Sequence, residues 1–163
     1  MITRQTIILM TLTVGMFLYL TAFEWERVPK PPPALPPLPA VDSGQVHAVE
    51  LQNGDQWFRV ERSEDGWDIK MPFTYPAQSS RVEALLAALA TLEPSRHIPE
   101  TDAKEQLNQF GLQPPRMTLR LESYATNREF KLGALTPLRD KVYLAVSDAP
   151  GVFVVPIHFL KTL

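Results

Sequence analysis

The three histidines are the side chains best suited to bind a transition metal or to move a proton. They are His47, His97 and His158, and none is spaced from another as in the HxH or HExxH patterns of zinc sites. An acidic turn at residues 64–68 carries three carboxylates, but a calcium loop needs a longer run of alternating oxygen ligands. We therefore expect no metal site.

The sequence also lacks the patterns of the common nucleophiles and cofactor sites. It contains no cysteine, which excludes disulfides, thiolate metal sites and cysteine nucleophiles. No GxSxG, SxxK, P-loop or GxGxxG motif is present, and Ser79 and Ser80 are best explained as helix caps. We expect no catalytic residue, no cofactor and no enzymatic activity.

Composition restricts the partners of the chain. Its 163 residues carry a formal net charge of −2, and 45% of them are hydrophobic. This is an ordinary globular composition, without the basic excess that nucleic-acid binding requires. The unusual feature is 16 prolines, which points to a segment outside the globular part.

An uncharged, mostly apolar run extends over residues 5–23, between Arg4 and Glu24. As a helix it would be about 28 Å long, close to the roughly 30 Å hydrocarbon core of a bilayer. The sequence predicts a single transmembrane anchor at residues 1–27, with Arg4 placing the N-terminus in the cytoplasm. The alternative is a cleaved signal peptide, but cleavage after Ala22 would place Leu20 where a small residue is preferred.

Three residues of this predicted anchor are candidate interaction positions. Thr11 and Gly15 form a pair of small residues that would let another helix approach closely. Trp25 lies at the outer end of the run, where aromatic rings favour the headgroup layer. The expected partners are therefore the lipid bilayer and other membrane subunits.

A proline-rich linker follows at residues 28–41, with seven prolines between Pro29 and Pro39. Proline fixes φ and removes the amide donor, so neither helix nor central strand is expected. We expect polyproline II, which would reach roughly 35 Å over these 11 residues. The segment is interpreted as a stiff stalk or a strap along a partner, and less readily as a ligand for a proline-binding module.

Residues 42–163 are predicted to form one α+β domain of antiparallel strands. Alternating apolar residues indicate strands on both sides of a helical segment, in the order βββ-αα-ββββ, with the helices on one face of the sheet. The first helix contains Leu85, Leu86 and Leu89 and has a Ser80/Glu83 capping-box pattern. The second is expected at residues 102–110.

The loop at residues 71–76 carries two aromatic residues between prolines. Phe73 and Tyr75 are the candidate interaction residues of the domain, since aromatic side chains are enriched at the centres of interfaces. The alternative is that they cover the open end of the domain core.

Several motifs in this order are similar to those of a known bacterial family. They are GWDIKMP, SRVEALLAALATLEPSRHI, LNQFGLQPPRMTLRL, FKLG, KVYLAV and GVFVVP. The chain resembles the family called domain of unknown function forty-three forty over about residues 45–163. The resemblance implies a membrane-anchored protein with its domain outside the inner membrane, often encoded beside gliding-type ABC transporter components. It carries over no catalytic residue.

The sequence thus predicts a non-enzymatic accessory or structural subunit of a bacterial inner-membrane complex. Its C-terminal domain would lie in the periplasm and make protein–protein contacts. The host could be a transporter or a respiratory or photosynthetic assembly. The alternative is a periplasmic module that binds a glycan or a lipid.

Overall fold

The computed structural model describes residues 4–25 and 35–162. The side chains of residues 5–9, 11, 22–25, 159, 161 and 162 lie outside that description. The chain divides into two compact units, residues 1–34 and residues 35–163. In the first unit, helix α1 extends over Arg4–Trp25. Within the described residues, no helix combines the length and the apolar character needed to cross a membrane.

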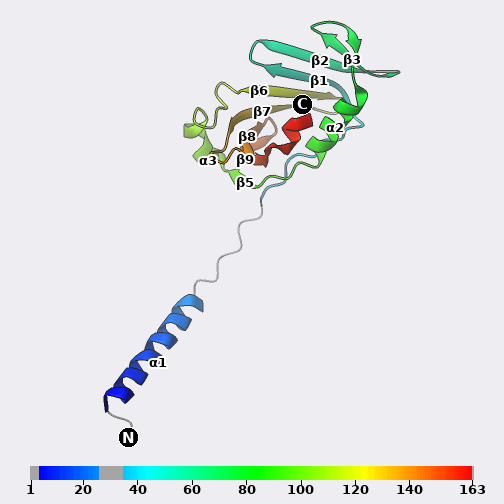
Figure 1. The fold of residues 1–163 in the computed structure, drawn as a ribbon. Coiled ribbons are helices and arrows are strands. Elements are labelled where there is room, and N and C mark those ends of the chain that lie inside the picture. Colours follow the sequence, from blue (N-terminus) through cyan, green and yellow to red (C-terminus); the bar gives the residue numbers. More distant parts are fainter. Residues whose placement is uncertain (1–3, 26–34, 163) are drawn as a thin grey trace. The chain divides into compact units, whose positions relative to one another are not determined.

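The second unit is an α+β domain built on one antiparallel sheet of nine strands (Figure 1). The strand order is β4-β3-β2-β1-β6-β7-β8-β9-β5. The strands are Val46–Asn53 (β1), Gln56–Ser63 (β2), Gly66–Met71 (β3), Tyr75–Pro76 (β4), Arg96–Ile98 (β5), Met117–Ser123 (β6), Asn127–Leu135 (β7), Lys141–Val146 (β8) and Ala149–Pro156 (β9).

The seven predicted strands are present, but two short ones were not expected. The two-residue strand β4 and the three-residue strand β5 form the two edges of the sheet. The predicted sheet segments before and after the helices are joined into one sheet, because β1 pairs with β6. Val49 of β1 lies between Val60 of β2 and Leu121 of β6.

The helical segments are shorter than the strands that they cover. Helix α2 extends over Ser79–Ala90, α3 over Glu100–Ala103, and the 3₁₀ helices η1 and η2 over Lys104–Gln106 and Ile157–Thr162. The second predicted helix, at residues 102–110, is wrong in its bounds: it begins earlier and changes to 3₁₀ geometry after one turn. Phe110 and Gly111 lie beyond it, and Gly111 has the predicted left-handed conformation, with φ +64°.

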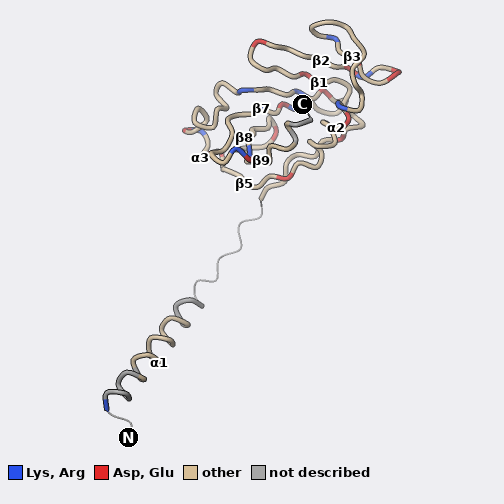
Figure 2. Tube along the Cα trace, in the orientation of Figure 1, with Lys and Arg blue, Asp and Glu red and all other residues tan. Residues whose placement is uncertain are grey.

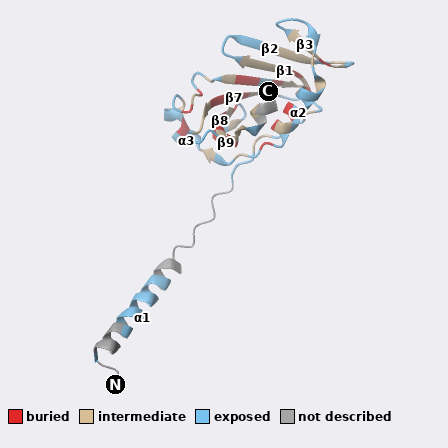
Figure 3. Ribbon diagram, in the orientation of Figure 1, coloured by how far each residue is buried: buried red, intermediate tan, exposed pale blue. Residues whose placement is uncertain are grey.

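The expectation that all helices cover one face of the sheet is also wrong. Leu86 of α2, Leu144 of β8 and Phe153 of β9 belong to the main hydrophobic cluster. The second cluster contains Ala103, Phe110, Leu112 and Val152. Because successive residues of a strand point to opposite faces, Val152 and Phe153 show that α3 and α2 lie on opposite sides. This explains the continuous apolar run of β9, all of which is buried from Val152 to Val155 (Figure 3).

The end of the proline-rich linker packs onto the domain. Leu38 and Val41 contact the main cluster, and Arg128 Nη1 donates hydrogen bonds to the carbonyl oxygens of Pro39 and Ala40 at 3.3 and 2.7 Å. Arg128 is itself held by a two-point contact with Asp148. Residues 38–41 thus form part of the folded unit and contain no helix or strand.

Truncation of Leu86 should test the packing of α2. Its side chain is fully buried, and removal of a buried leucine side chain typically costs about 2–5 kcal/mol. We expect Leu86→Ala to lower the free energy of unfolding of a 35–163 fragment by that amount in urea titrations. The control is Leu138→Ala at a side chain that is 85% exposed, where a change within about 0.5 kcal/mol is expected. Equal effects of the two substitutions would contradict the placement of α2.

Candidate functional site

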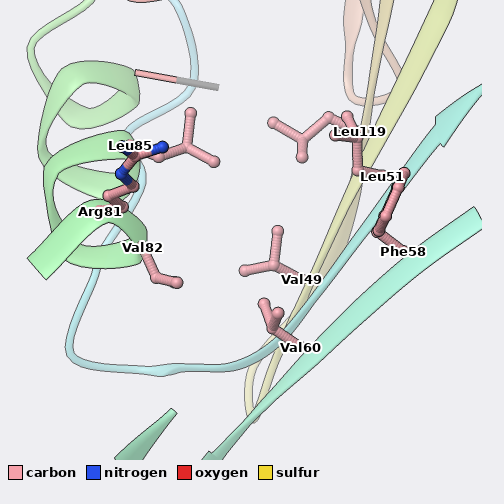
Figure 4. Close-up of a pocket in the computed structure, with 8 residues that line it drawn as sticks. All are labelled: Val49, Leu51, Phe58, Val60, Arg81, Val82, Leu85 and Leu119. Atoms are coloured by element: carbon pink, nitrogen blue, oxygen red, sulfur yellow. The ribbon is translucent and has the colours of Figure 1, made fainter. Parts of the chain in front are cut away.

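The candidate site is an apolar groove between helix α2 and the sheet, here called the α2 groove. Val82 and Leu85 of α2 face Val49, Val60 and Leu119 of β1, β2 and β6 (Figure 4). The other residues that line it are Leu51, Phe58 and Arg81. The cavity measures about 150 Å³, a size that can hold a benzene-sized apolar group.

The α2 groove exists because α2 is too short to cover the sheet. Its 12 residues give a length of about 18 Å, whereas nine strands extend over roughly 38 Å. Helix η2 lies beside α2 on the same face (Figure 1). Parts of β1 and β2 therefore remain uncovered, and Phe58 is 41% exposed.

Trp67 of β3 fixes the first turns of α2 to the sheet. Its backbone N–H donates to Ser79 Oγ at 3.1 Å, and its indole Nε1–H donates to Glu83 Oε1 at 2.9 Å. Arg62 completes the contact, since its guanidinium lies 4.8 Å from the indole ring centroid and 3.1 Å from Glu83 Oε1. The Trp67 side chain is buried, so these partners satisfy its polar atoms.

These contacts replace the predicted helix cap. The residue before α2 is Gln78, and no side chain caps this helix start. The predicted Ser80/Glu83 capping box is therefore wrong, as is the prediction that Ser79 caps the helix. The physical reason is tertiary: Ser79 and Glu83 accept hydrogen bonds from Trp67 instead, and Glu83 also pairs with Arg62.

Three exposed apolar residues, here called the aromatic rim, lie at the edge of the sheet, in and between β3 and β4. Met71, Phe73 and Tyr75 are 39%, 80% and 69% exposed. Ile69 pairs with both Val60 and Tyr75, and directly paired residues share a face of the sheet. Tyr75 therefore lies on the same face as the groove, whereas Met71 follows a β-bulge and pairs with Arg59.

Arg81 is the one charged residue that lines the α2 groove. It is exposed, and within the described residues its side chain forms neither an ion pair nor a hydrogen bond. No carboxylate lines the cavity. The groove thus combines an aliphatic interior with an unpaired cation.

The opposite face of β1, β2, β6 and β7 carries a ladder of ion pairs. Arg59 donates hydrogen bonds to Glu50, to Glu61 at 2.6 Å and to both carboxylate oxygens of Glu122 at 2.8 and 2.9 Å. Arg120 Nε donates to Glu129 at 2.9 Å. Acidic and basic positions are interspersed over the domain (Figure 2), so no single-sign field is directed at a ligand.

This ladder shifts three pKa values. The hydrogen bonds from Arg59 hold the pKa of Glu122 below its usual value, and the same contact raises the pKa of Arg59. Burial acts to raise the pKa of Glu129, but its contacts with Arg120 and Lys131 outweigh burial and lower it. These carboxylates are ionised and paired, which suits a structural role better than proton transfer.

The five predicted interaction residues belong to different units of the chain. Phe73 and Tyr75 are exposed, so they do not cover the core. Thr11, Gly15 and Trp25 belong to α1; Gly15 is exposed, whereas the side chains of Thr11 and Trp25 lie outside the described part of the structure.

The histidines that the structure describes do not gather with several acidic residues, as the ligands of a metal ion would. His47 stacks on Tyr124 and lies 3.9 Å from Glu122, and His97 Nε2 lies 2.9 Å from the carbonyl oxygen of Pro150. Among the described residues, no group of three or more histidine, aspartate or glutamate side chains is arranged to hold a metal ion.

Sequence reasoning missed the α2 groove, because its lining residues read as ordinary core positions. The sequence places Val49 and Phe58 in alternating apolar patterns and Leu85 in an apolar pattern of helical spacing, as is typical of buried residues. The signal that could have revealed the groove is a mismatch in size, since one helix of 12 residues cannot cover many strands. Arg81, next to apolar Val82, was not singled out.

The pairing of Arg59 with Glu122 predicts how stability depends on pH. The pKa of Glu122 is lower in the folded than in the unfolded chain, so the unfolded state binds more protons in the acidic range. Stability should therefore fall as pH drops below about 4.5. Arg59→Met should make this fall shallower and also reduce stability at neutral pH, measured by urea titrations across that range.

The control for this prediction is Arg96→Met. Arg96 is exposed and forms no ion pair within the described residues, so its replacement should leave the pH dependence unchanged. An Arg59→Met variant with the wild-type pH dependence would contradict the assignment.

Comparison with known proteins places this domain in a family. The family model described as "Domain of unknown function (DUF4340)" matches residues 67–163, more than half of the chain. The match begins at Trp67 and includes α2 with one side of the α2 groove. No curated protein and no solved structure matches the chain significantly. The resemblance noted from the sequence motifs is therefore confirmed, and the chain belongs to the DUF4340 family.

Proposed function

We propose that the protein is a non-enzymatic accessory subunit of a bacterial inner-membrane complex. Residues 1–27 would anchor it by a single transmembrane helix, residues 28–41 would form the linker, and the domain would contact other subunits in the periplasm. The aromatic rim is the observation that carries this proposal. Exposed apolar residues that lie together favour an interaction site, and aromatic side chains supply much of the binding energy of interfaces.

What supports the anchor is the sequence of residues 5–23, which is uncharged and mostly apolar. Thr11 and Gly15 would allow another membrane helix to approach this segment closely. Trp25 would lie in the headgroup layer. A stiff proline-rich linker is consistent with a partner at a fixed distance from the bilayer.

The absence of the common catalytic motifs supports a non-enzymatic role. Within the described residues, the acidic groups with shifted pKa values, Glu122 and Glu129, lie in ion pairs with arginine and lysine. Such pairs keep carboxylates ionised, whereas a general acid needs a raised pKa.

A second candidate function is ligand binding by the domain. The observation that favours it is the α2 groove, which offers an apolar cavity of about 150 Å³ beside an unpaired arginine. Apolar cavities with few polar groups are the usual sites of small ligands. The two functions use different residues and can coexist.

Photo-crosslinking in living cells would test the aromatic rim. Phe73→p-benzoylphenylalanine and Tyr75→p-benzoylphenylalanine variants of the full chain should each form a discrete adduct with a membrane subunit. Truncating the neighbouring rim residue in the same chain should weaken that adduct several-fold, because hot-spot aromatic residues dominate binding.

Tyr124→p-benzoylphenylalanine is the matched control. Tyr124 is 79% exposed, but it stacks on His47 away from the rim, so no discrete adduct is expected there. The proposal is wrong if the rim positions give no adduct, or if Tyr124 gives the same adducts with equal yield.

A further inference from the structure

We propose that the α2 groove binds the hydrocarbon chain of a single-chain carboxylate, of the fatty-acid class, with Arg81 contacting its carboxylate. This inference rests on the ligand-binding candidate above and is independent of the aromatic rim. It follows from the polar groups that the groove lacks, from its size and from its one cation.

The lining of the groove favours a hydrocarbon over a peptide or a glycan. Seven of its eight lining residues are apolar. β1 forms hydrogen-bonded ladders with β2 on one side and β6 on the other, so the backbone groups of the groove floor are already paired. A peptide or a sugar would lose its hydrogen bonds to water there and find one guanidinium in return, which is unfavourable. A hydrocarbon loses no hydrogen bond.

The charge of the groove favours an acidic headgroup. Arg81 is unpaired within the described residues, and no acidic side chain lines the cavity. Its neighbour on the helix, Glu83, is held by Arg62 and Trp67 and does not compete for Arg81. A planar guanidinium binds a carboxylate through two parallel hydrogen bonds.

The size of the groove favours one chain. A cavity of about 150 Å³ holds an apolar group of about six carbon atoms, which corresponds to one short hydrocarbon chain. A double-chain phospholipid would leave its second chain in water. We therefore assign the site to a free single-chain acid.

Photolabelling of the full-length protein tests this assignment. The protein is placed in lipid nanodiscs, because detergent chains would compete for the groove. The probe is octanoic acid with a diazirine near its methyl end, compared with the methyl ester of the same acid. Labelled residues are located by mass spectrometry of the peptides that contain β1, β2 and α2.

We expect the acid to label groove residues such as Val60 and Leu85. Arg81→Gln should reduce this labelling about tenfold, the usual weight of a hydrogen bond to a charged group, and Arg81→Lys should restore part of it. The methyl ester should label the wild type as weakly as the acid labels Arg81→Gln. The matched control, Arg96→Gln, removes another exposed arginine without an ion pair in the described part of the chain and should change nothing.

Three outcomes would overturn the proposal in distinguishable ways. Equal labelling of the groove by acid and ester would leave the groove as an apolar binding site and show that Arg81 selects no carboxylate. Labelling that avoids the groove altogether would remove the ligand-binding candidate as well. An adduct between a Phe58→p-benzoylphenylalanine variant and a second protein, with no labelling of the wild type by the acid, would make the occupant an apolar side chain of a partner.

Discussion

The indole of Trp67 joins helix α2 to the sheet, and the rest of the domain depends on that contact. The indole N–H donates to Glu83 and the backbone N–H of Trp67 donates to Ser79, both on the first turns of the helix, and the ring lies in the main core cluster. The preceding residue must be glycine, because Gly66 has φ +136° and an added Cβ would lie 2.5 Å from Ser79 Oγ. The start of β3 is thus fixed to the start of α2 by hydrogen bonds, by core packing and by a backbone conformation that requires glycine.

The position of α2 divides the domain into a closed and an open half. Towards β6–β9, both faces of the sheet are covered, by α2 and η2 on one side and by the segment around Phe110 and Leu112 on the other. Towards the hairpin end of β1 and β2, α2 leaves the apolar face uncovered, and Phe58 is exposed there. The opposite face of β1 and β2 carries the ion pairs of Arg59. Charged groups of this kind can remain in contact with water. The uncovered apolar surface is the α2 groove and the aromatic rim, and both proposals concern that surface.

Local patterns in the sequence predict much of this fold, and tertiary contacts decide the rest. Alternation predicts the long strands, and the spacing of Leu85, Leu86 and Leu89 predicts the buried side of α2. The two edge strands are too short to show a period. The Ser80/Glu83 cap was predicted from local spacing, but Glu83 forms its contacts with residues 16 and 21 positions away. Which face of the sheet is covered by α2 and which by α3 depends on how the chain passes from one face to the other. The local pattern of a single sequence does not specify that path.

The residues of the candidate site also differ in how far the sequence alone predicts them. Phe73 and Tyr75 could be named as candidates from the sequence, because they are two aromatic residues between prolines, but only their exposure argues against a place in the core. The α2 groove could not, since it arises from what the helix leaves uncovered. Arg81 can be recognised as a candidate binding residue only when the structure shows that the other residues lining the groove are apolar and include no carboxylate.

The most direct test of the account is a crystal structure of residues 35–163 under xenon pressure, because xenon enters apolar cavities that water leaves empty. The central claim is that α2, held by Trp67, leaves an apolar groove against the sheet. The account predicts a xenon atom between Val49, Val60 and Leu85, with the indole of Trp67 in contact with Glu83. An α2 packed closely against β1 and β2, with no xenon between them, would contradict it.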